Sequence, residues 1–424
     1  MTLKTTIKSL SRDRLINYAF TFGFEFLIMI ISVILFKIIN LKFLEIGFSE
    51  YTVNKRLVSF LMPLLMMGMG VSLPKFLSIE SEKKQLEIHY SAIVIVSVLF
   101  LFSLLLGFGL SEQFSQMVFG DVHHEKMCLV ILFYVFSLMI HACVYNYFRG
   151  KFKFKTSSFL QLLNIGVLPL ITYFFADDIY HYFLYLSVFT LTLLIVVNLL
   201  WIPLLKLSVE DFKSSFKKLM TYGIQRMPGD VVLGLFFALP TFIASNYFSL
   251  IIAGNIAFCI SLFNIIIALM SPVNIILLPE ASKIVSEKNF SLLKSISTKL
   301  LVLSLGLGVF SFLVIFLFGD FILELFSVTN VKEVSLMLMI VFFGVIGYSV
   351  FSVIRSIVDA YYETAKVSFN IIFAFCSFLL FLFALQLFNV FTINNTLRVF
   401  SLSVNILGLL TCLSLFKIYK LQKI

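Results

Sequence analysis

The chain contains little charge and little cysteine for its length. Of its 424 residues, 13% are charged and 60% are hydrophobic, with a mean hydropathy of +1.06. Soluble domains carry about 25% charged residues. The five cysteines lie in or beside apolar stretches without CxxC spacing, which indicates core residues and no disulfide framework. The composition therefore excludes a soluble globular protein.

Nucleotide-binding and catalytic motifs are also missing from the sequence. GxxxxGK[ST], HExxH and GxSxG do not occur, and the polar links between apolar stretches are too short for an ATPase domain. His123 and His124 beside Asp121 and Glu125 have two interpretations, a metal site and a solvated loop, and the solvated loop is favoured. The sequence predicts a transporter that is not an enzyme and needs no cofactor.

Long apolar stretches fill the chain instead. Each is about 20 residues long, enough for a helix to cross a bilayer core of about 30 Å. Both ends of the chain are polar, so we expect no cleavable signal peptide. The sequence predicts an all-α integral membrane protein with about twelve spans, at 15–38, 55–77, 91–111, 127–148, 157–176, 180–204, 219–246, 250–279, 296–319, 334–357, 366–389 and 396–416.

An internal repeat divides these spans into two sets of six. The stretch Leu73–Lys83 superposes on Leu278–Lys288 with a shift of 205 residues and six identities in eleven positions. A repeat of half the chain length in a membrane protein predicts two similar halves. We expect an N-terminal lobe at 1–205, a polar cytoplasmic link at 206–218 and a C-terminal lobe at 219–424.

Basic residues predict the orientation of the spans. They gather in alternate links, which is typical of the cytoplasmic side. The net charge of +10 is thus explained by topology, and no nucleic-acid partner is expected. This places both termini in the cytoplasm and makes the two lobes a parallel repeat. The basic residues are Lys75, Lys83, Lys84, Arg149, Lys151, Lys153, Lys155, Lys206, Lys213, Lys217, Lys218, Lys283, Lys288, Lys294, Lys299, Arg355, Lys366, Lys417, Lys420 and Lys423.

Short landmarks in both halves follow a recognisable order. They are Phe48-Ser49-Glu50-Tyr51, Gly68-Met69-Gly70, Leu73-Pro74, Tyr222-Gly223-Ile224, Pro228, Ala253-Gly254-Asn255-Ile256-Ala257, and Pro272 through Leu278-Pro279. This order resembles the polysaccharide-transport flippases, and most of all the Wzx-type O-antigen flippases of the multidrug/oligosaccharidyl-lipid/polysaccharide (MOP) superfamily. The resemblance extends over nearly the whole chain in length, helix count and order of landmarks.

The resemblance implies a fold and an activity. Two six-helix lobes would form a V-shaped transporter, as in multidrug MATE proteins, around a polar cavity that opens to each side in turn. The substrate would be an undecaprenyl-pyrophosphate-linked oligosaccharide, moved from the cytoplasmic to the periplasmic leaflet of the bacterial inner membrane. An O-antigen polymerase and a chain-length regulator would be protein partners, and membrane lipid would surround the chain.

Two carboxylates within predicted spans are candidates for ion coupling. Glu25 lies about 15 Å into the first span, and the repeat offset pairs it with Asp230, since 25 + 205 = 230. A desolvated carboxylate can bind a proton or Na⁺ and bias the opening. The alternatives are a protonated or hydrogen-bonded Glu25, and an ion pair between Asp230 and Arg226, four residues earlier.

Cations near the span ends are candidates for binding pyrophosphate. Lys55 and Arg56 open the second span from the outer side, and Arg226 enters the seventh from the cytoplasmic side. Arginine suits phosphate because it donates two parallel hydrogen bonds. The alternative is snorkelling to lipid headgroups, which is the favoured interpretation for Arg149 and Arg355.

Prolines within the spans predict helix bends that fit moving helices. They are Pro63, Pro228, Pro240 and Pro272. Static kinks are the alternative interpretation.

Two other functions share parts of this pattern. A multidrug or small-molecule exporter would have the same six-plus-six plan, with a more apolar cavity and no need for arginines in it. A membrane polysaccharide polymerase would have a long outer loop, which this sequence lacks.

Overall fold

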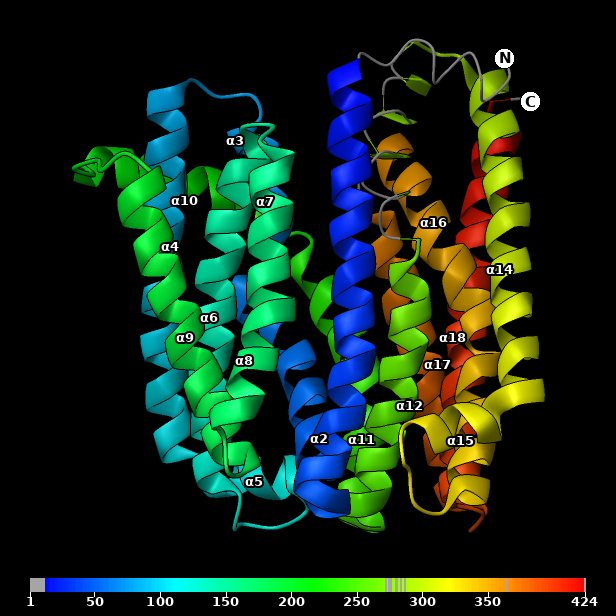
Figure 1. Cartoon of the computed structure of the whole chain (residues 1–424). Helices are drawn as coiled ribbons and strands as arrows, with labels where there is room; N and C mark the ends of the chain where they lie inside the picture. Colours follow the sequence, from blue (N-terminus) through cyan, green and yellow to red (C-terminus); the bar gives the residue numbers. More distant parts are fainter. Residues whose placement is uncertain are drawn as a thin grey trace. The chain divides into compact units, whose positions relative to one another are not determined.

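The computed structural model describes residues 12–270, 273, 277–278, 281–282, 284–285, 287–362 and 365–422, and within these ranges every regular element is a helix (Figure 1). The helices are α2 (Arg12–Met66), α3 (Met69–Leu77), α4 (Glu82–Gly109), α5 (Ser111–Phe119), α6 (Glu125–Gly150), α7 (Phe154–Gln161), the π-helix η1 (Leu162–Val167), α8 (Leu168–Phe175), α9 (Ile179–Trp201), α10 (Val209–Gly223), α11 (Met227–Tyr247), α12 (Leu250–Ala268), α14 (Phe290–Leu325), α15 (Val331–Phe343), α16 (Val345–Tyr361), α17 (Lys366–Leu387) and α18 (Ile393–Leu421). The all-α membrane fold predicted from composition is confirmed.

The first two predicted spans belong to one long element. The described residues contain eleven helices long and apolar enough to cross a membrane, and the first of them is Ala19–Met66, with 48 residues. At 1.5 Å per residue it would measure about 72 Å, more than twice a bilayer core. Leu44 has φ 58° and ψ −172°, so the helix is interrupted there. Eleven helices therefore correspond to the twelve predicted spans.

The chain packs into two compact units, and neither is continuous in sequence. Unit 1 comprises Met1–Ile38, Met62–Ser111 and Glu125–Ile224. Unit 2 comprises Ile39–Leu61, Glu112–His124 and Gln225–Ile424. The predicted lobes are defined by the sequence repeat, whereas the units are defined by which residues pack together. The units therefore do not test the lobe boundaries, which stay a prediction. Most of the predicted polar link is helical, because Ser208 caps α10 by accepting a hydrogen bond from the backbone of Asp211.

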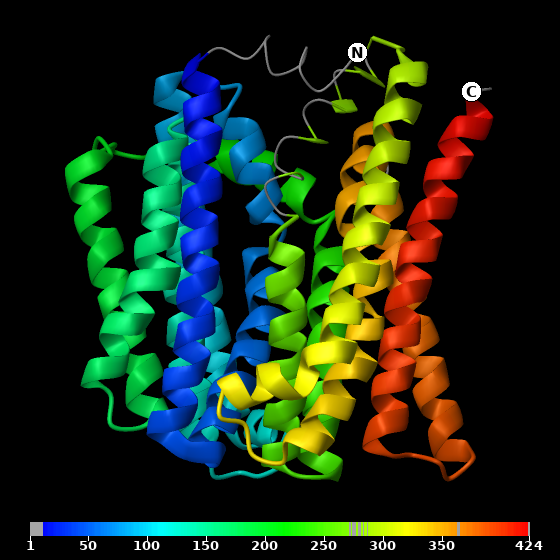
Figure 2. The ribbon, with the colours of Figure 1, turned by 45° about the vertical axis from the view of Figure 1, so that its right-hand side comes forward.

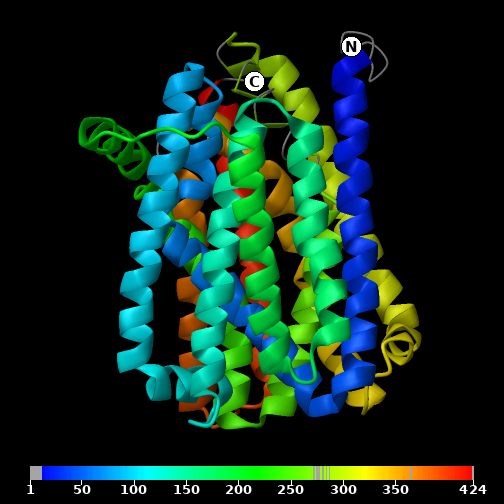
Figure 3. The same cartoon turned by 60° about the vertical axis from the view of Figure 1, so that its left-hand side comes forward.

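Unit 1 is built around α6, which contacts α3, α4, α7 and α9 (Figure 3). Two-thirds of the residues in the most apolar stretch of α6 are buried inside the protein.

A tight backbone contact holds α3 to the end of α10. Gly68 has φ +75°, and a Cβ placed there would lie 2.2 Å from the carbonyl oxygen of Gly223. Only glycine accommodates both the left-handed conformation and this close approach.

Unit 2 is built around α16, which lies against α14 and α18 (Figure 2). The helices approach closely at Gly347 and Gly408, where a Cβ on Gly408 would lie 2.4 Å from the carbonyl oxygen of Gly347. Small residues at such contacts are typical of membrane helices. Phenylalanines fill the space between α11, α17 and α18, with Phe236 and Phe400 fully buried.

The prolines predicted to bend helices occupy different positions. Pro63 lies inside α2 and Pro240 inside α11, and each helix continues through its proline. Pro228 stands in the first turn of α11, after α10 has ended at Gly223. There its missing N–H costs no helical hydrogen bond. Pro272 lies outside the described residues.

Candidate functional site

Arg56 is a buried cation in unit 2. Its side chain is 4% exposed, and its Nη2 donates a hydrogen bond of 2.8 Å to the hydroxyl of Ser261 on α12. Its Nε and Nη1 have no hydrogen-bond partner in the part of the chain that the structure describes. No salt bridge to Arg56 occurs among the residues that the structure describes. A guanidinium without a counter-charge in the protein interior is costly and suits an anionic ligand.

Polar residues and a second cation precede Arg56 in the same segment. Thr52, one turn earlier, donates to the carbonyl oxygen of Gly254 at 3.0 Å. Asn54 is completely buried, and neither atom of its amide has a partner. Arg56 and Asn54 thus both have hydrogen-bond donors that no described residue accepts from. The neighbouring cation, Lys55, has its ammonium 5.4 Å from the centre of the Tyr51 ring.

The contact around Arg56 joins equivalent positions of the internal repeat. Arg56 and Ser261 are separated by 205 residues, the offset found in the sequence. The same offset relates Ser49 to Gly254, where a Cβ on the glycine would lie 2.3 Å from the Ser49 hydroxyl oxygen. Equivalent segments that touch at equivalent residues are related by a local two-fold arrangement. Residues 49–56 and α12 therefore face each other at matching positions.

A second charged cluster in unit 2 centres on Arg355 of α16. Its Nη2 lies 3.3 Å from Oδ1 of Asp230, and its Nε lies 3.5 Å from Oδ2 of Asp359. The side chains of Arg355 and Asp230 are 32% and 25% exposed. One cation thus joins two carboxylates, one from the first turn of α11 and one from the last turn of its own helix.

The structure corrects the snorkelling interpretation of Arg355, because its guanidinium is held between Asp230 and Asp359. The side chain of Asp230 thus pairs with Arg355, which is 125 residues away in the sequence, whereas the sequence predicted a pair with Arg226. The backbone N–H of Asp230 does donate to the Arg226 carbonyl at 3.3 Å. Arg226 also lies close enough to Asp359 to interact with it electrostatically.

Glu25 occupies a half-buried position in unit 1, where it interacts electrostatically with Arg149 at the end of α6. Arg149 and Arg355 are 206 residues apart (355 − 149), close to the repeat offset. Each carboxylate predicted from the repeat thus interacts with an arginine, although the two arginines miss the repeat offset by one residue, since 149 + 205 = 354 and residue 354 is Ile.

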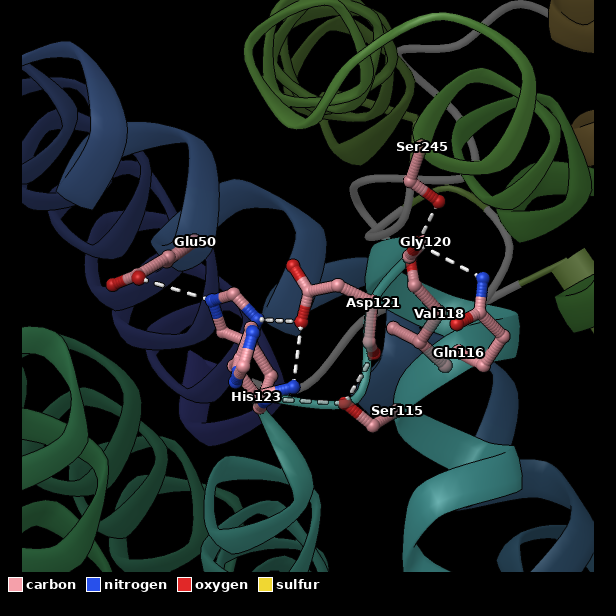
Figure 4. A network of polar contacts seen from close by, with 9 residues as sticks. Glu50, Ser115, Gln116, Val118, Gly120, Asp121, His123 and Ser245 are labelled. Atoms are coloured by element: carbon pink, nitrogen blue, oxygen red, sulfur yellow. Dashed lines mark hydrogen bonds and ion pairs between the residues drawn. The ribbon is translucent and has the colours of Figure 1, made fainter.

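A polar network around His124 fixes the link between α5 and α6 (Figure 4). Nδ1 of His124 lies 2.8 Å from Oδ1 of Asp121, and Nε2 lies 3.2 Å from Oε1 of Glu50. The imidazole stacks on Phe119, with ring centres 4.4 Å apart. Ser245 of α11 donates to the carbonyl oxygen of Val118 at 2.7 Å. The network attaches residues 115–124 to α2 and to α11.

The protonation of this network follows from its contacts. The hydrogen bond to Glu50 raises the pKa of His124, burial lowers it, and the hydrogen bond to Asp121 raises it further, so that the net direction is upward. Burial acts to raise the pKa of Asp121, but hydrogen bonds from His124 and from the backbone of His123 bring it below its usual value. Imidazolium and carboxylate stabilise each other.

Comparison with solved structures places these clusters in a known architecture. An inward-facing multidrug-resistance MATE transporter of the MOP superfamily superposes with a TM-score of 0.76 at 11% identity, over 96% of this chain and 95% of that one. The lipid II flippase MurJ, in an inward closed conformation, gives 0.73 at 14% identity, over 95% and 87%. An outward-facing MATE transporter gives 0.68 at 11% identity, over 96% of both chains.

The chain has the fold of the MOP-superfamily transporters. No protein-family model and no curated protein matches the sequence. The identities of 10–14% among these solved structures show the fold alone. The neighbours are transporters and a lipid flippase, and the chain is a multi-pass membrane protein of the same architecture.

Removal of Arg355 is expected to destabilise the protein more than removal of Asp230. Arg355→Gln leaves Asp230 and Asp359 without their shared cation, whereas Asp230→Asn leaves Arg355 paired with Asp359. We expect Arg355→Gln to cost about 1–2 kcal/mol, below the range for fully buried pairs because the side chains are partly exposed. Thermal unfolding in detergent measures both variants. In the double variant Arg355→Gln/Asp230→Asn, part of the lost stability should be recovered, because one unpaired carboxylate is removed. Losses of stability in the two single variants that simply add in the double variant would contradict this account.

The His124 network is expected to stabilise the protein at low pH more than at high pH. Because folding raises the pKa of His124, its contribution is complete below about pH 6.5, the usual histidine value, and disappears as the pH rises through the folded value. Asp121 has a lowered pKa, so its contribution is lost only at acidic pH, as the pH falls through the folded value. His124→Gln should therefore lower the melting temperature more at pH ~6 than at pH ~9. The control is His123→Gln at both pH values, and an equal loss for His124→Gln at both would refute the assignment.

Proposed function

We propose that the protein is a flippase of the MOP superfamily that moves undecaprenyl-pyrophosphate-linked O-antigen units across the bacterial inner membrane. Transport runs from the cytoplasmic to the periplasmic leaflet by alternating access. The observation that carries this proposal is Arg56, a buried guanidinium with two nitrogens free for a ligand. A pyrophosphate offers the oxygens that such a group binds in pairs.

The chemistry of Arg56 favours an anionic substrate over a cationic or neutral one. A cationic drug would meet repulsion from the buried guanidinium, whereas a phosphate would neutralise it and satisfy its donors. The amide of Asn54, which is also without a partner, can bind a further phosphate or sugar oxygen. Lys55 and Arg226 supply additional positive charge within the same unit. The likeness to a lipid II flippase supports a lipid-linked substrate.

The direction of transport agrees with the membrane potential. A cell-negative potential favours outward movement of an anion by about 2.3 kcal/mol per charge per 100 mV. The protein then needs mainly to lower the barrier for a large polar headgroup. Both termini lie in the cytoplasm in this proposal, and an O-antigen polymerase and a chain-length regulator would receive the flipped unit.

Glu25 and Asp230 are the proposed coupling carboxylates for a proton or Na⁺. Each interacts with an arginine, Arg149 or Arg355. Protonation of Asp230 would weaken its pair with Arg355 and leave the arginine paired with Asp359 alone. The carboxylate and the arginine come from different helices, α11 and α16, so a change in their pairing can be transmitted between helices.

A second candidate function is export of small molecules or drugs. The likeness to multidrug-resistance MATE transporters supports it. Such a protein has no use for an unpaired buried guanidinium, which is why we place this candidate second. A polymerase is disfavoured because the predicted outer links are short.

The proposed function is tested by deleting the gene and locating its lipid-linked units. We expect complete single units to accumulate in the inner leaflet and surface polysaccharide to be lost. In complementation, Arg56→Gln should lower transport about tenfold or more, because a hydrogen bond to a charged group contributes about 1.5–3 kcal/mol. Arg398→Gln, at an exposed arginine bonded only locally to Asn395, is the matched control. Accumulation in the outer leaflet would instead indicate a polymerase, and unchanged lipid-linked units would indicate an exporter.

Ion coupling is tested by neutralising the two carboxylates. If Glu25 and Asp230 titrate during transport, Glu25→Gln and Asp230→Asn should each lower the rate and flatten its dependence on pH. The rate is measured with lipid-linked units in proteoliposomes under an imposed pH or Na⁺ gradient. Full transport by both variants at every pH would assign the carboxylates a structural role.

A further inference from the structure

A groove of about 520 Å³ lies in unit 1, near the start of α7. Aromatic side chains from four helices, α2, α6, α7 and α9, form much of its wall, and two lysines and a threonine complete it. The residues on which the argument depends are Phe20, Phe24, Phe159, Trp201, Lys153 and Lys155. The residues of this groove belong to unit 1, whereas Arg56 and Arg355 belong to unit 2.

The two lysines of the groove are available for an anion. Both are exposed, and neither takes part in a salt bridge among the described residues. The ammonium of Lys155 lies 4.7 Å from the centre of the Phe20 ring, a contact that leaves its charge uncompensated. Lys151, in the same link, is instead bound to Glu82 at 3.1 Å. No carboxylate lines the groove.

The aromatic wall is suited to an acyl chain. Phe20, Phe159 and Trp201 are 45%, 41% and 48% exposed, although they are large and apolar. Trp201 is the single tryptophan of the chain. Tryptophan and lysine side by side are typical of the boundary between lipid headgroups and hydrocarbon. Lys153 and Lys155 lie in one of the links whose basic residues predict a position on the cytoplasmic side.

We propose that this groove binds an anionic phospholipid of the bilayer, with its phosphate on Lys153 and Lys155 and an acyl chain along Phe24, Phe159 and Trp201. Basic pockets between membrane helices on the cytoplasmic side bind anionic headgroups in this way. The lining offers one hydroxyl, from Thr156, and no amide, so it does not suit an oligosaccharide. The occupant is thus a structural or regulatory lipid rather than the transported unit. The inference does not rest on the proposed function.

A second groove provides a comparison within the same chain. It has a similar volume of about 530 Å³, in unit 2, and its wall includes Tyr247, Phe383 and Phe391. No charged residue lines it. This groove is uncharged, although Gln386 and Asn389 add amides to its wall, so it has no cation to select an anionic headgroup. Selectivity for anionic lipid is therefore expected only where the lysines are.

Trp201 allows a direct test, because its fluorescence reports on this groove alone. The protein is reconstituted in phosphatidylcholine, and the indole is quenched with lipids brominated in their acyl chains. Brominated phosphatidylglycerol should bind near Trp201 more tightly than brominated phosphatidylcholine, by about fivefold per lysine. The preference should disappear in Lys153→Gln/Lys155→Gln and persist in Lys151→Gln, the matched control from the same link.

Three results would overturn the proposal. The first is equal quenching by the two lipids in the unmodified protein. The second is an unchanged preference in the double lysine variant, provided that its thermal unfolding shows it to be folded. The third is recovery of fluorescence when undecaprenyl diphosphate is added at the concentration of the protein, which would assign the groove to the carrier lipid of the proposed substrate. Failure of the proposed function would leave the quenching result unaffected.

Discussion

The close approach of residues 49–56 to α12 is the constraint on which the polar interior of unit 2 depends. Gly254 permits it, because any side chain there would collide with Ser49. The approach brings Thr52 to the Gly254 carbonyl and Arg56 to Ser261. Arg56 gains one hydrogen bond and loses nearly all contact with solvent, while two of its nitrogens remain without partners. A substitution at Gly254 would thus disturb the cation without touching it.

Arg56 and Arg355 illustrate two uses of arginine in a membrane protein. Arg355 is held between Asp230 and Asp359, and Arg226 also interacts with Asp359, so each arginine of this cluster faces a carboxylate. Arg56 has no carboxylate partner among the described residues, so it can bind an anionic ligand without first breaking an ion pair. The first arrangement suits a switch, and the second suits binding of an anion.

Much of the architecture could be predicted from the sequence, because hydropathy and the repeat depend on local composition. The repeat singled out Glu25 and Asp230, and the positions of Lys55, Arg56 and Arg226 marked them as candidate cations. The partner of Asp230 could not be predicted, since Arg355 is 125 residues away and only packing brings α16 to α11. Local patterns also missed the discontinuous units, because residues 39–61 join helices that follow much later in the chain.

The polar network at His124 explains why such a discontinuous unit holds together. Residues 112–124 come from the first half of the sequence, yet Val118 accepts a hydrogen bond from Ser245 of α11. Glu50 reaches the same segment through His124. The contacts of His124 with Glu50 and Asp121 depend on pH, because both hydrogen bonds raise the pKa of the imidazole. Val118 and Phe119 of the same segment are also buried, so apolar packing and the polar network together attach residues 112–124 to unit 2.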